Sequence, residues 1–420
     1  MAVSRSRLRS AARALYGLLD LALLPVLPVL AAASRLAPRR VAVGLGPLPL
    51  INSVYHKRAL ERRGYSAETF VHHVYHITDD FDVRLLLPRP LGYLARHLLF
   101  VRALFRYRIL YHSFDGGSLG DTVLLAPLEP LLYRLAGIRT VVLPYGSDVQ
   151  DLRRCPNPGF VEAMRIDYPG QERRAAAVAR RIRRWSRYAD HIVSGCDWVD
   201  YTPRIDTSML SHFAIDVEDW DLPTAPPAPP LRVLHAPNHR AVKGTVYLEA
   251  AVEALRNEGL EIELVLREGV PNQAIREAMA TCHVVADQFV IGWYAMFAVE
   301  AMAARRPTLC FVRDDLESRF VRAGLLEPGE LPLLRTAPSP EAIAERLRQL
   351  AEAPATLGEV GDRSRDFVVR HHSLEAIGGI FESINRSLGV APERPAPAPG
   401  GAPPRSAPGR PATSRGRVEA

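Results

Sequence analysis

Two basic side chains and one carboxylate stand where they could hold a nucleotide. Arg240 and Lys243 follow a predicted strand and precede Gly244, as at a strand-to-helix turn. Cations and backbone N–H groups at such a turn can bind a diphosphate, because both present positive charge to phosphate oxygens. Glu300 lies eight residues after Gly292, which precedes a second predicted helix. A carboxylate there can accept hydrogen bonds from ribose hydroxyls. Together these residues predict a site for an activated sugar nucleotide.

Each of these residues also has a structural interpretation. An acid such as Glu300 is favoured in the first turn of a helix by the helix dipole. Lys243 and Arg240 can be solvated charges at a helix start. The functional interpretation therefore depends on the residues meeting at the carboxyl ends of neighbouring strands, which the fold has to arrange.

Size and composition limit the class of protein. The chain has 420 residues, of which 48% are hydrophobic and 24% charged, and this is enough for two ordinary domains. The spacing of its four cysteines fits neither a metal site nor a secreted disulfide framework. We expect reduced core thiols in a cytosolic compartment.

The net charge of +7 is concentrated at the two ends of the chain. Residues 1–40 carry +6 and residues 391–420 carry +3, which leaves −2 for residues 41–390. A slightly acidic body argues against a nucleic-acid partner. Basic ends favour attraction to anionic lipid headgroups instead.

The first forty residues are expected to associate with a membrane. Asp20 is the only formal charge in the apolar run 14–34, which as one helix would span about 30 Å. Pro25 and Pro28 argue against a continuous helix. We expect a peripheral or monotopic anchor on the inner, cytoplasmic face of the cell membrane. A transmembrane span, a plain amphipathic helix and a cleaved signal remain alternatives.

Strands and helices alternate along most of the chain. The first half predicts strands at 40–47, 65–70, 109–112, 140–143 and 191–194, with helices at 53–63, 122–136 and 171–188. The second half predicts strands at 232–235, 261–266, 283–286 and 307–312, with helices at 246–258, 271–280, 297–304, 339–353 and 358–388. This alternation is typical of parallel sheets covered on both faces.

A proline-rich break divides the two halves, so the fold class is α/β with two doubly wound, Rossmann-like domains facing each other across a cleft. We expect five segments: a membrane-associating segment 1–40, an acceptor-side domain 41–215, a linker 216–230, a nucleotide-binding domain 231–390 and a disordered tail 391–420.

At these residues the chain resembles the GT-B-fold glycosyltransferases, and its second half resembles the retaining family 4 (glycosyl transferases group 1). The resemblance implies that Arg240 and Lys243 bind the donor diphosphate. It also implies that Glu300, in the sequence Glu-Ala-Met-Ala, binds the donor ribose. Such enzymes need no resident cofactor; the co-substrate would be a UDP- or GDP-linked sugar, and no metal ion is required.

Two positions depart from the family pattern. Gly292 stands where the family has a first glutamate beside the transferred sugar, and Asn238 stands at the usual arginine position. The sequence is closest to a subgroup with Asp-Gln before a Gly-Trp-Tyr turn. Asp287, Gln288, Gly292 and Tyr294 fit this subgroup, and we expect Asp287 or Gln288 to replace part of the missing carboxylate. Asp287 as a turn cap and Tyr294 as a core aromatic are the alternatives.

The first half should receive the acceptor. His112 ends a predicted strand where related enzymes place a histidine near the reacting sugar, and Asp148 follows the next strand. Inverting transfer requires a base for the acceptor hydroxyl, a role that suits Asp148, whereas His112 suits an orienting role. For both His112 and Asp148, the alternative is a structural role in a turn or in the core.

The sequence therefore predicts a membrane-associated glycosyltransferase that acts on a hydroxyl of a lipid-linked or cell-envelope polysaccharide acceptor. Two other functions remain open. One is a nucleotide-sugar 2-epimerase of the same fold. The other is a non-catalytic membrane-bound scaffold, which the glycine at position 292 would suit.

Overall fold

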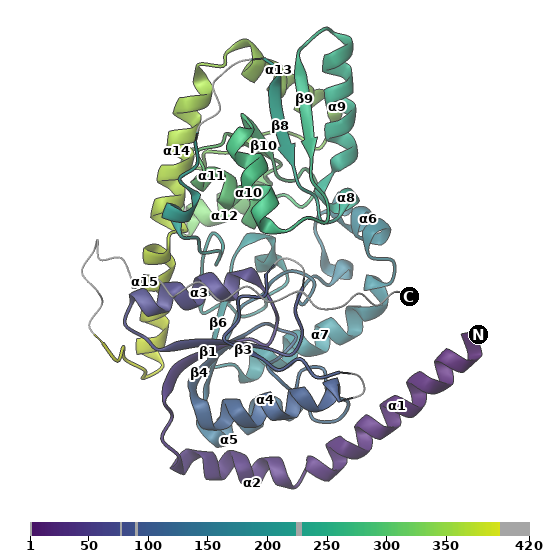
Figure 1. Cartoon of the computed structure of the whole chain (residues 1–420), viewed down its shortest axis with the longest axis vertical. Helices are drawn as coiled ribbons and strands as arrows, with labels where there is room; N and C mark the ends of the chain where they lie inside the picture. The colour runs from purple at the N-terminus through teal and green to yellow at the C-terminus, as the bar shows by residue number, and fades with distance from the viewer. Residues whose placement is uncertain (1, 76–77, 89–90, 224–228, 395–420) are drawn as a thin grey trace, which may run out of the picture.

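The computed structural model describes residues 2–75, 78–88, 91–223 and 229–394, with side chains from residue 11 onward. The expected tail therefore lies outside the described residues from 395 on, and so does the linker segment 224–228. The described chain forms two α/β lobes, one above the other in Figure 1, with the N-terminal helices along the far end of the first lobe.

The first lobe is built on a seven-stranded parallel sheet. Its strand order is β3–β2–β1–β4–β5–β6–β7, and every pairing is parallel. The strands are β1 (Val41–Leu45), β2 (Ala67–Val71), β3 (Val83–Arg84), β4 (Tyr107–His112), β5 (Arg139–Val142), β6 (His191–Ser194) and β7 (Thr207–Ser208). All five residues of β1 are buried, as expected for a strand covered on both faces.

Helices cover both faces of this sheet (Figure 1). They are α3 (Ile51–Arg62), α4 (Gly92–Arg106), α5 (Glu129–Ala136) and α7 (Gln171–Tyr188). The lobe also contains α6 (Pro158–Asp167) and the short 3-10 turns η2 (Leu152–Arg154), η3 (Cys196–Asp200) and η4 (Val217–Trp220). The helix predicted at 122–136 begins only at Glu129, because Pro127 and Pro130 restrict the preceding backbone.

The second lobe contains a five-stranded parallel sheet in the order β12–β11–β10–β8–β9. Its strands are β8 (Leu231–His235), β9 (Ile262–Leu266), β10 (Val284–Ala286), β11 (Thr308–Cys310) and β12 (Leu334–Arg335). Its helices are α8 (Arg240–Lys243), α9 (Thr245–Asn257), α10 (Asn272–Thr281), α11 (Met296–Ala303), α12 (Asp314–Arg322), α13 (Pro340–Glu352) and α14 (Thr356–His371). Two parallel sheets in separate lobes confirm the predicted α/β class with two Rossmann-like units.

The chain returns to the first lobe at its end. The helix predicted at 358–388 is broken at His372, and Ser373 caps a new helix, α15 (Leu374–Ser387), by accepting the Ala376 N–H. This helix packs on α3, and its Asn385 accepts a hydrogen bond from Tyr111 of β4. The range 231–390 expected for the second domain therefore includes a helix that belongs spatially to the first lobe.

Two helices precede the first sheet: α1 (Ala2–Leu23) and α2 (Val26–Ala33), followed by the 3-10 turn η1 (Ser34–Leu36). The chain bends between them at Pro25, as Pro25 and Pro28 predict. Within the described residues no single helix has the length and apolar character of a membrane span. The pair Ala11–Leu23 and Val26–Leu36, bent by 48°, meets that test jointly.

Candidate functional site

Lys243 lies at the carboxyl edge of the second sheet. It is the last residue of α8, its side chain is 10% exposed, and its ammonium lies 2.9 Å from Asp287 Oδ1. The ammonium also donates to Gln288 Oε1 at 3.1 Å. An ammonium has three protons, so one remains for a ligand. Gly244, with φ +70°, lets the chain turn directly from α8 into α9.

The start of α11 lies beside this ammonium. The second oxygen of Asp287 accepts the Ala295 N–H at 2.9 Å, which ties the end of β10 to the helix start. The next two amides, of Met296 and Phe297, have no hydrogen-bond partner among the described residues, as is usual for the first turn of a helix. One lysine and two free amides form a site that an anion can fill.

Arg240 lies apart from this group. Its guanidinium pairs with Glu249 at 2.5 Å and with Glu268 at 3.0 Å, and its side chain is 45% exposed. Two carboxylates already neutralise its charge. In this arrangement binding of Arg240 to a diphosphate would require its guanidinium to leave both carboxylates.

Glu300 is buried in α11 and accepts a hydrogen bond from Asn272 of α10 at 2.9 Å. Burial raises its pKa to about 7, and the negative charge of Asp287 contributes in the same direction. The carboxyl group therefore lies within electrostatic range of Asp287 and titrates near neutral pH. Asn272 as its partner is not predictable from a sequence pattern, because the contact joins two separate helices.

Gly292 cannot be replaced by the family's glutamate without rearrangement. Its φ is +96°, and a Cβ there would lie 2.5 Å from Arg313 Cγ. Arg313 itself pairs with Asp200 of the first lobe at 2.8 Å. An arginine three residues past β11 thus occupies the space beside this turn. Its position shortly after a strand end is the sequence signal that could identify it.

Tyr294 is directed away from the anion site. It is 1% exposed, and its hydroxyl lies 2.9 Å from His372 Nε2. The neighbouring Trp293 donates its indole N–H to Leu210 O of the first lobe at 3.1 Å. Gln288 also points inward, because its amide nitrogen donates to Trp293 O. The Gly-Trp-Tyr turn joins the two lobes, so the donor-binding role predicted for Tyr294 has no geometric support.

His112 ends β4 as predicted. Its Nδ1 lies 2.8 Å from Ser113 O, and because a carbonyl only accepts, Nδ1 carries the proton. Burial lowers its pKa to about 4, so the ring is neutral at pH 7. Its Nε2 is buried and has no partner within the described part of the chain. That nitrogen is an unused hydrogen-bond acceptor.

Asp148 is fully buried, and its carboxylate accepts hydrogen bonds from the backbone of two loops. Its Oδ1 accepts the amides of Tyr145 and Gly146, and its Oδ2 accepts the Phe114 N–H, each at 3.0 Å. Burial and the charge of Asp115 raise its pKa to about 7. With both oxygens bonded to backbone, Asp148 positions the loops after β4 and β5. This geometry favours its structural interpretation over the predicted role of base.

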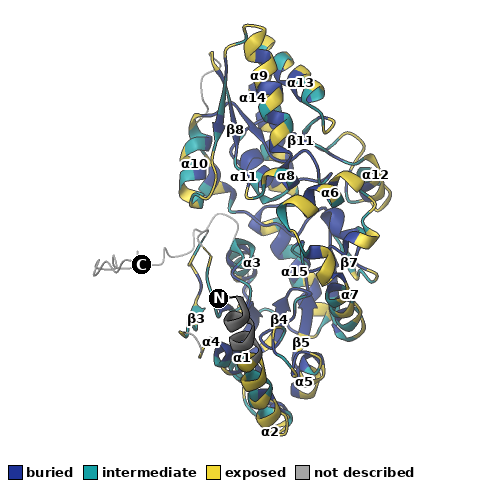
Figure 2. Cartoon of the chain, turned by 90° about the vertical axis from the view of Figure 1, so that its right-hand side faces the viewer, coloured by how far each residue is buried: buried dark blue, intermediate teal, exposed yellow. Residues whose placement is uncertain are grey.

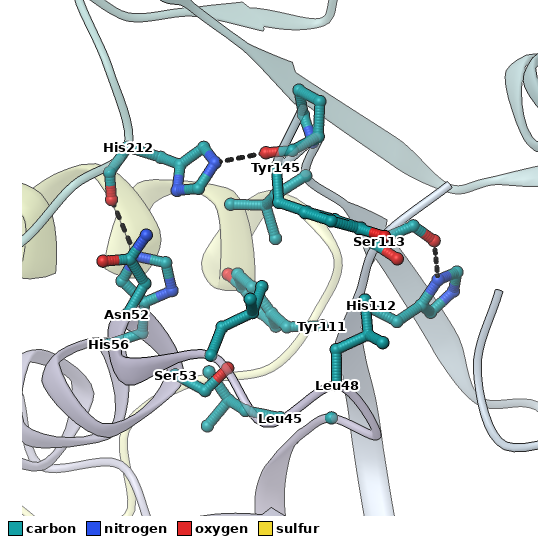
Figure 3. A pocket seen from close by; sticks show the side chains of 14 residues that line it. Leu45, Leu48, Asn52, Ser53, His56, Tyr111, His112, Ser113, Tyr145 and His212 are labelled. Atoms are coloured by element: carbon teal, nitrogen blue, oxygen red, sulfur yellow. Dashed lines mark hydrogen bonds between the residues drawn. The ribbon is translucent and has the colours of Figure 1, made fainter. Parts of the chain in front are cut away.

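A narrow pocket opens beside these loops at the carboxyl end of the first sheet (Figure 3). It holds about 40 Å³, room for a few waters or a hydroxyl group. His212 Nε2 lies 2.6 Å from Pro144 O and so carries the ring proton, while burial lowers the pKa of His212 to about 4. Its Nδ1 and Asn52 Oδ1 are buried acceptors without a partner among the described residues. Sequence reasoning missed both, since neither follows a strand directly.

The lobes are in contact near the donor side. Asp167 at the end of α6 accepts the Val242 N–H of α8 at 2.7 Å, and Asn157 donates to Val290 O at 2.7 Å. Apolar residues of both lobes fill the space between these bonds: Leu152, Phe160, Ala163, Met164, Val242 and Val290. The structure therefore represents an arrangement in which α6 covers part of the carboxyl edge of the second sheet.

Comparison with known proteins identifies the fold. No family model and no curated protein matches the sequence. Among solved structures, sucrose-phosphate synthase from Thermosynechococcus elongatus is similar over 83% of this chain and 99% of its own, with 13% identity and a TM-score of 0.55. HepE of Anabaena in complex with UDP is similar over 83% and 100%, with 12% identity and a TM-score of 0.53.

An alpha-glucosyltransferase in complex with UDP and a 13-mer DNA is also similar, over 83% of this chain and 100% of its own, with 11% identity and a TM-score of 0.54. At these identities the likeness concerns the fold. The GT-B architecture expected from the sequence is thereby confirmed, whereas the resemblance to family 4 stays a prediction.

Proposed function

We propose that this protein is a glycosyltransferase that moves a sugar from a nucleotide-linked donor to a hydroxyl group. The acceptor oxygen forms a bond to the anomeric carbon of the sugar, the bond from that carbon to the diphosphate breaks, and the hydroxyl proton leaves with the nucleoside diphosphate or with solvent. The residues at the second sheet would stabilise the charge on the departing diphosphate.

The observation that carries this proposal is the placement of Lys243 Nζ beside the free amides at the start of α11. It supplies a cation and two N–H donors at the carboxyl edge of a GT-B sheet. Solved structures of this fold contain UDP, in HepE, or UDP-glucose, in an alpha-glucosyltransferase. These neighbours favour a UDP-linked donor over a GDP-linked one. Glu300 would bind the ribose.

The acceptor would approach the first lobe. His112 Nε2, His212 Nδ1 and Asn52 Oδ1 are lone-pair acceptors with no protein donor among the described residues. A hydroxyl-bearing ligand supplies the donors that they lack, which is why we propose a sugar or polyol acceptor. Its attachment to a lipid or an envelope polysaccharide is proposed from the basic, apolar residues 1–40, as is a location on the inner face of the membrane. We propose no resident cofactor or metal ion and no nucleic-acid partner.

Calorimetry with UDP and GDP tests the donor site. Lys57 and Lys243 are the two lysines of the chain, and Lys57 is also half-buried and paired with a carboxylate, Asp82. We expect Lys243→Gln to weaken UDP binding by about 10- to 100-fold, because a charge-assisted hydrogen bond is lost. Lys57→Gln is the matched control and should bind as the wild type does. Equal binding by all three proteins would show that the site is elsewhere.

A non-catalytic scaffold is the second candidate, favoured by Arg313 beside Gly292, where the family has a carboxylate. If the wild type binds neither UDP nor GDP, the scaffold is the better description. If a nucleotide binds, a donor screen with membrane extracts, read by mass spectrometry, should detect a product heavier by one sugar. Incubation with donor alone separates transfer from 2-epimerisation, since an epimerase forms product without an acceptor.

A further inference from the structure

The end of the first lobe opposite the second lobe has an unusual surface, which we call the basal face. It consists of α1, α2, η1, α5 and the last turn of α7. Within residues 11–40 and 129–137, the acids are Asp20 and Glu129, and both are fully buried. This surface therefore presents no negative side chain from those segments. Figure 2 shows α1, α2 and α5 together at this end, with exposed residues along their outer sides.

Asp20 fixes the orientation of α1 on the lobe. Its two oxygens lie 2.8 Å from His97 Nε2 and 2.8 Å from Tyr93 Oη, both on α4, and the Leu124 N–H donates to it at 2.8 Å. A buried carboxylate with three partners holds its helix in place, because each partner would otherwise be left unpaired. The opposite side of α1 must then face outward.

The outward side is apolar. Exposed leucines and valines follow one another along α1, α2 and η1, and α5 adds two more beside them: Leu15, Leu18, Leu21, Leu24, Val26, Val29, Leu36, Leu131 and Leu135. Val29 is 67% exposed and Leu36 is 91% exposed. A continuous row of this kind marks an interaction surface, since soluble surfaces normally scatter such residues singly.

Arginines border the apolar row. Arg13, Arg35, Arg134 and Arg187 are exposed, and none pairs with a carboxylate of the described residues. Three of them form one border, because Arg35 lies against Gly137 at the end of α5 while Arg134 and Arg187 both lie over the ring of Tyr188 at the end of α7. Their free charge, and the absence of exposed acids from residues 11–40 and 129–137, are complementary to an anionic surface.

We infer that the basal face binds the surface of an anionic lipid bilayer, with α2 and the adjoining part of α1 against the membrane and held to the lobe by Asp20. Leucine and valine side chains enter the acyl boundary, and the bordering arginines meet the headgroups. The inference rests on the membrane location in the proposed function and extends it to α5 and α7. It also orients the molecule, because the second lobe then stands away from the lipid (Figure 1).

Vesicle flotation of the full chain tests this without any sugar donor. Vesicles of phosphatidylcholine alone and of phosphatidylcholine with phosphatidylglycerol are the probes. Leu18→Glu with Val29→Glu should lower binding to both by about a hundredfold, since two apolar side chains are lost from the acyl boundary. Val246→Glu is the matched control, because Val246 on α9 of the second lobe is as exposed as Leu18, 63% in each case.

Arg134→Gln with Arg187→Gln should lower binding about 30-fold on the anionic vesicles and have little effect on phosphatidylcholine alone. Arg322→Gln with Arg363→Gln, two exposed arginines of the second lobe, should bind as the wild type does. Thermal unfolding checks that each variant is folded. UDP calorimetry on the same samples reports separately on the proposed donor site.

Two results would overturn the inference. In the first, the folded wild type fails to float with either vesicle, or both control variants lose binding equally. In the second, analytical ultracentrifugation shows a dimer that Leu18→Glu with Val29→Glu converts to monomer, without vesicle binding by the wild type. The basal face would then be an interface between two copies of the chain.

Discussion

Lys243 and Asp287 form a buried ion pair in which the same carboxylate that neutralises the ammonium also binds the first amide before α11. The pair links α8, the end of β10 and the start of α11 in one contact. A diphosphate at this point would accept hydrogen bonds from the remaining ammonium proton and from the two free amides beside it. The pair thus sets the position of the lysine before any ligand arrives.

Asp287→Ala should reduce the free energy of unfolding by about 3–5 kcal/mol, because it leaves a buried ammonium and an amide without their acceptor. Chemical denaturation measures this loss. Asp315→Ala is a suitable control, since Asp315 also pairs with an arginine, Arg313, but its side chain is 65% exposed. Equal losses in both variants would mean that the Lys243 pair is not buried in solution.

The affinity for UDP should rise with pH through about 7. Burial holds the pKa of Glu300 near 7, and the ionised carboxylate is the better acceptor for two ribose hydroxyls. One pH unit below 7, we expect binding about tenfold weaker than at high pH. Calorimetry across this range should show the change in the wild type and lose it in Glu300→Gln. A pH dependence that persists in Glu300→Gln would assign it to another group.

The raised pKa of Glu300 also predicts the direction in which the stability of the protein changes with pH. The Glu300 pKa is raised from 4.5 to about 7 in the folded protein, so the folded state holds this proton more tightly than the unfolded state. Its contribution to stability is therefore greatest below 4.5 and is lost as the pH rises through 7. Glu300→Gln, which stays uncharged at all pH values, removes this pH dependence, and denaturation at two pH values can detect the change.

Gly292→Glu should destabilise the protein by about 3 kcal/mol and should not strengthen donor binding. The φ of +96° is unfavourable for any side chain, and the new Cβ would collide with Arg313. The measurement is unfolding together with UDP calorimetry. If the variant were as stable as the wild type and bound UDP more tightly, the family's glutamate position would be open here after all.

Tyr294→Phe should lower the free energy of unfolding by about 1–3 kcal/mol and leave the affinity for UDP unchanged. The hydroxyl of Tyr294 pairs with buried His372, and its removal leaves that ring nitrogen without a partner. Denaturation and calorimetry on one preparation give both values. A large loss of UDP affinity with little loss of stability would restore Tyr294 to the donor site.

Much of the fold follows from the sequence because buried parallel strands leave a plain apolar signal. The predicted helix at 171–188 coincides with α7, and its apolar positions Val178, Ile182 and Trp185 are buried as its periodicity indicates. The helix α4 was not predicted, although His97 and Tyr93 on it anchor α1. Its inward residues are partly polar, so their burial depends on a carboxylate from a distant segment that no local pattern reveals.

The candidate site was only partly predictable for the same reason. Strand ends and glycine turns single out Lys243, Asp287 and Glu300 in the sequence. The fold pairs Lys243 with Asp287 and places Glu300 within electrostatic range of Asp287, while their role in binding a donor stays a prediction. Which side chain each of the predicted residues contacts depends on the tertiary structure. Arg240 meets two glutamates, and Tyr294 meets a histidine 78 positions away. Sequence spacing contains no information about such pairings.

The return of the chain to the first lobe governs how the molecule can open. It crosses between the lobes near Ile215 and again near Ser373, and the two crossings are joined, since the Ile215 N–H donates to His372 O at 2.9 Å. Two joined connections restrict the relative motion of the lobes more than a single connection would. We expect this double connection to limit the relative motion of the lobes to rotation about it. A fragment cut at the linker would lose α15, which packs on α3 of the first lobe.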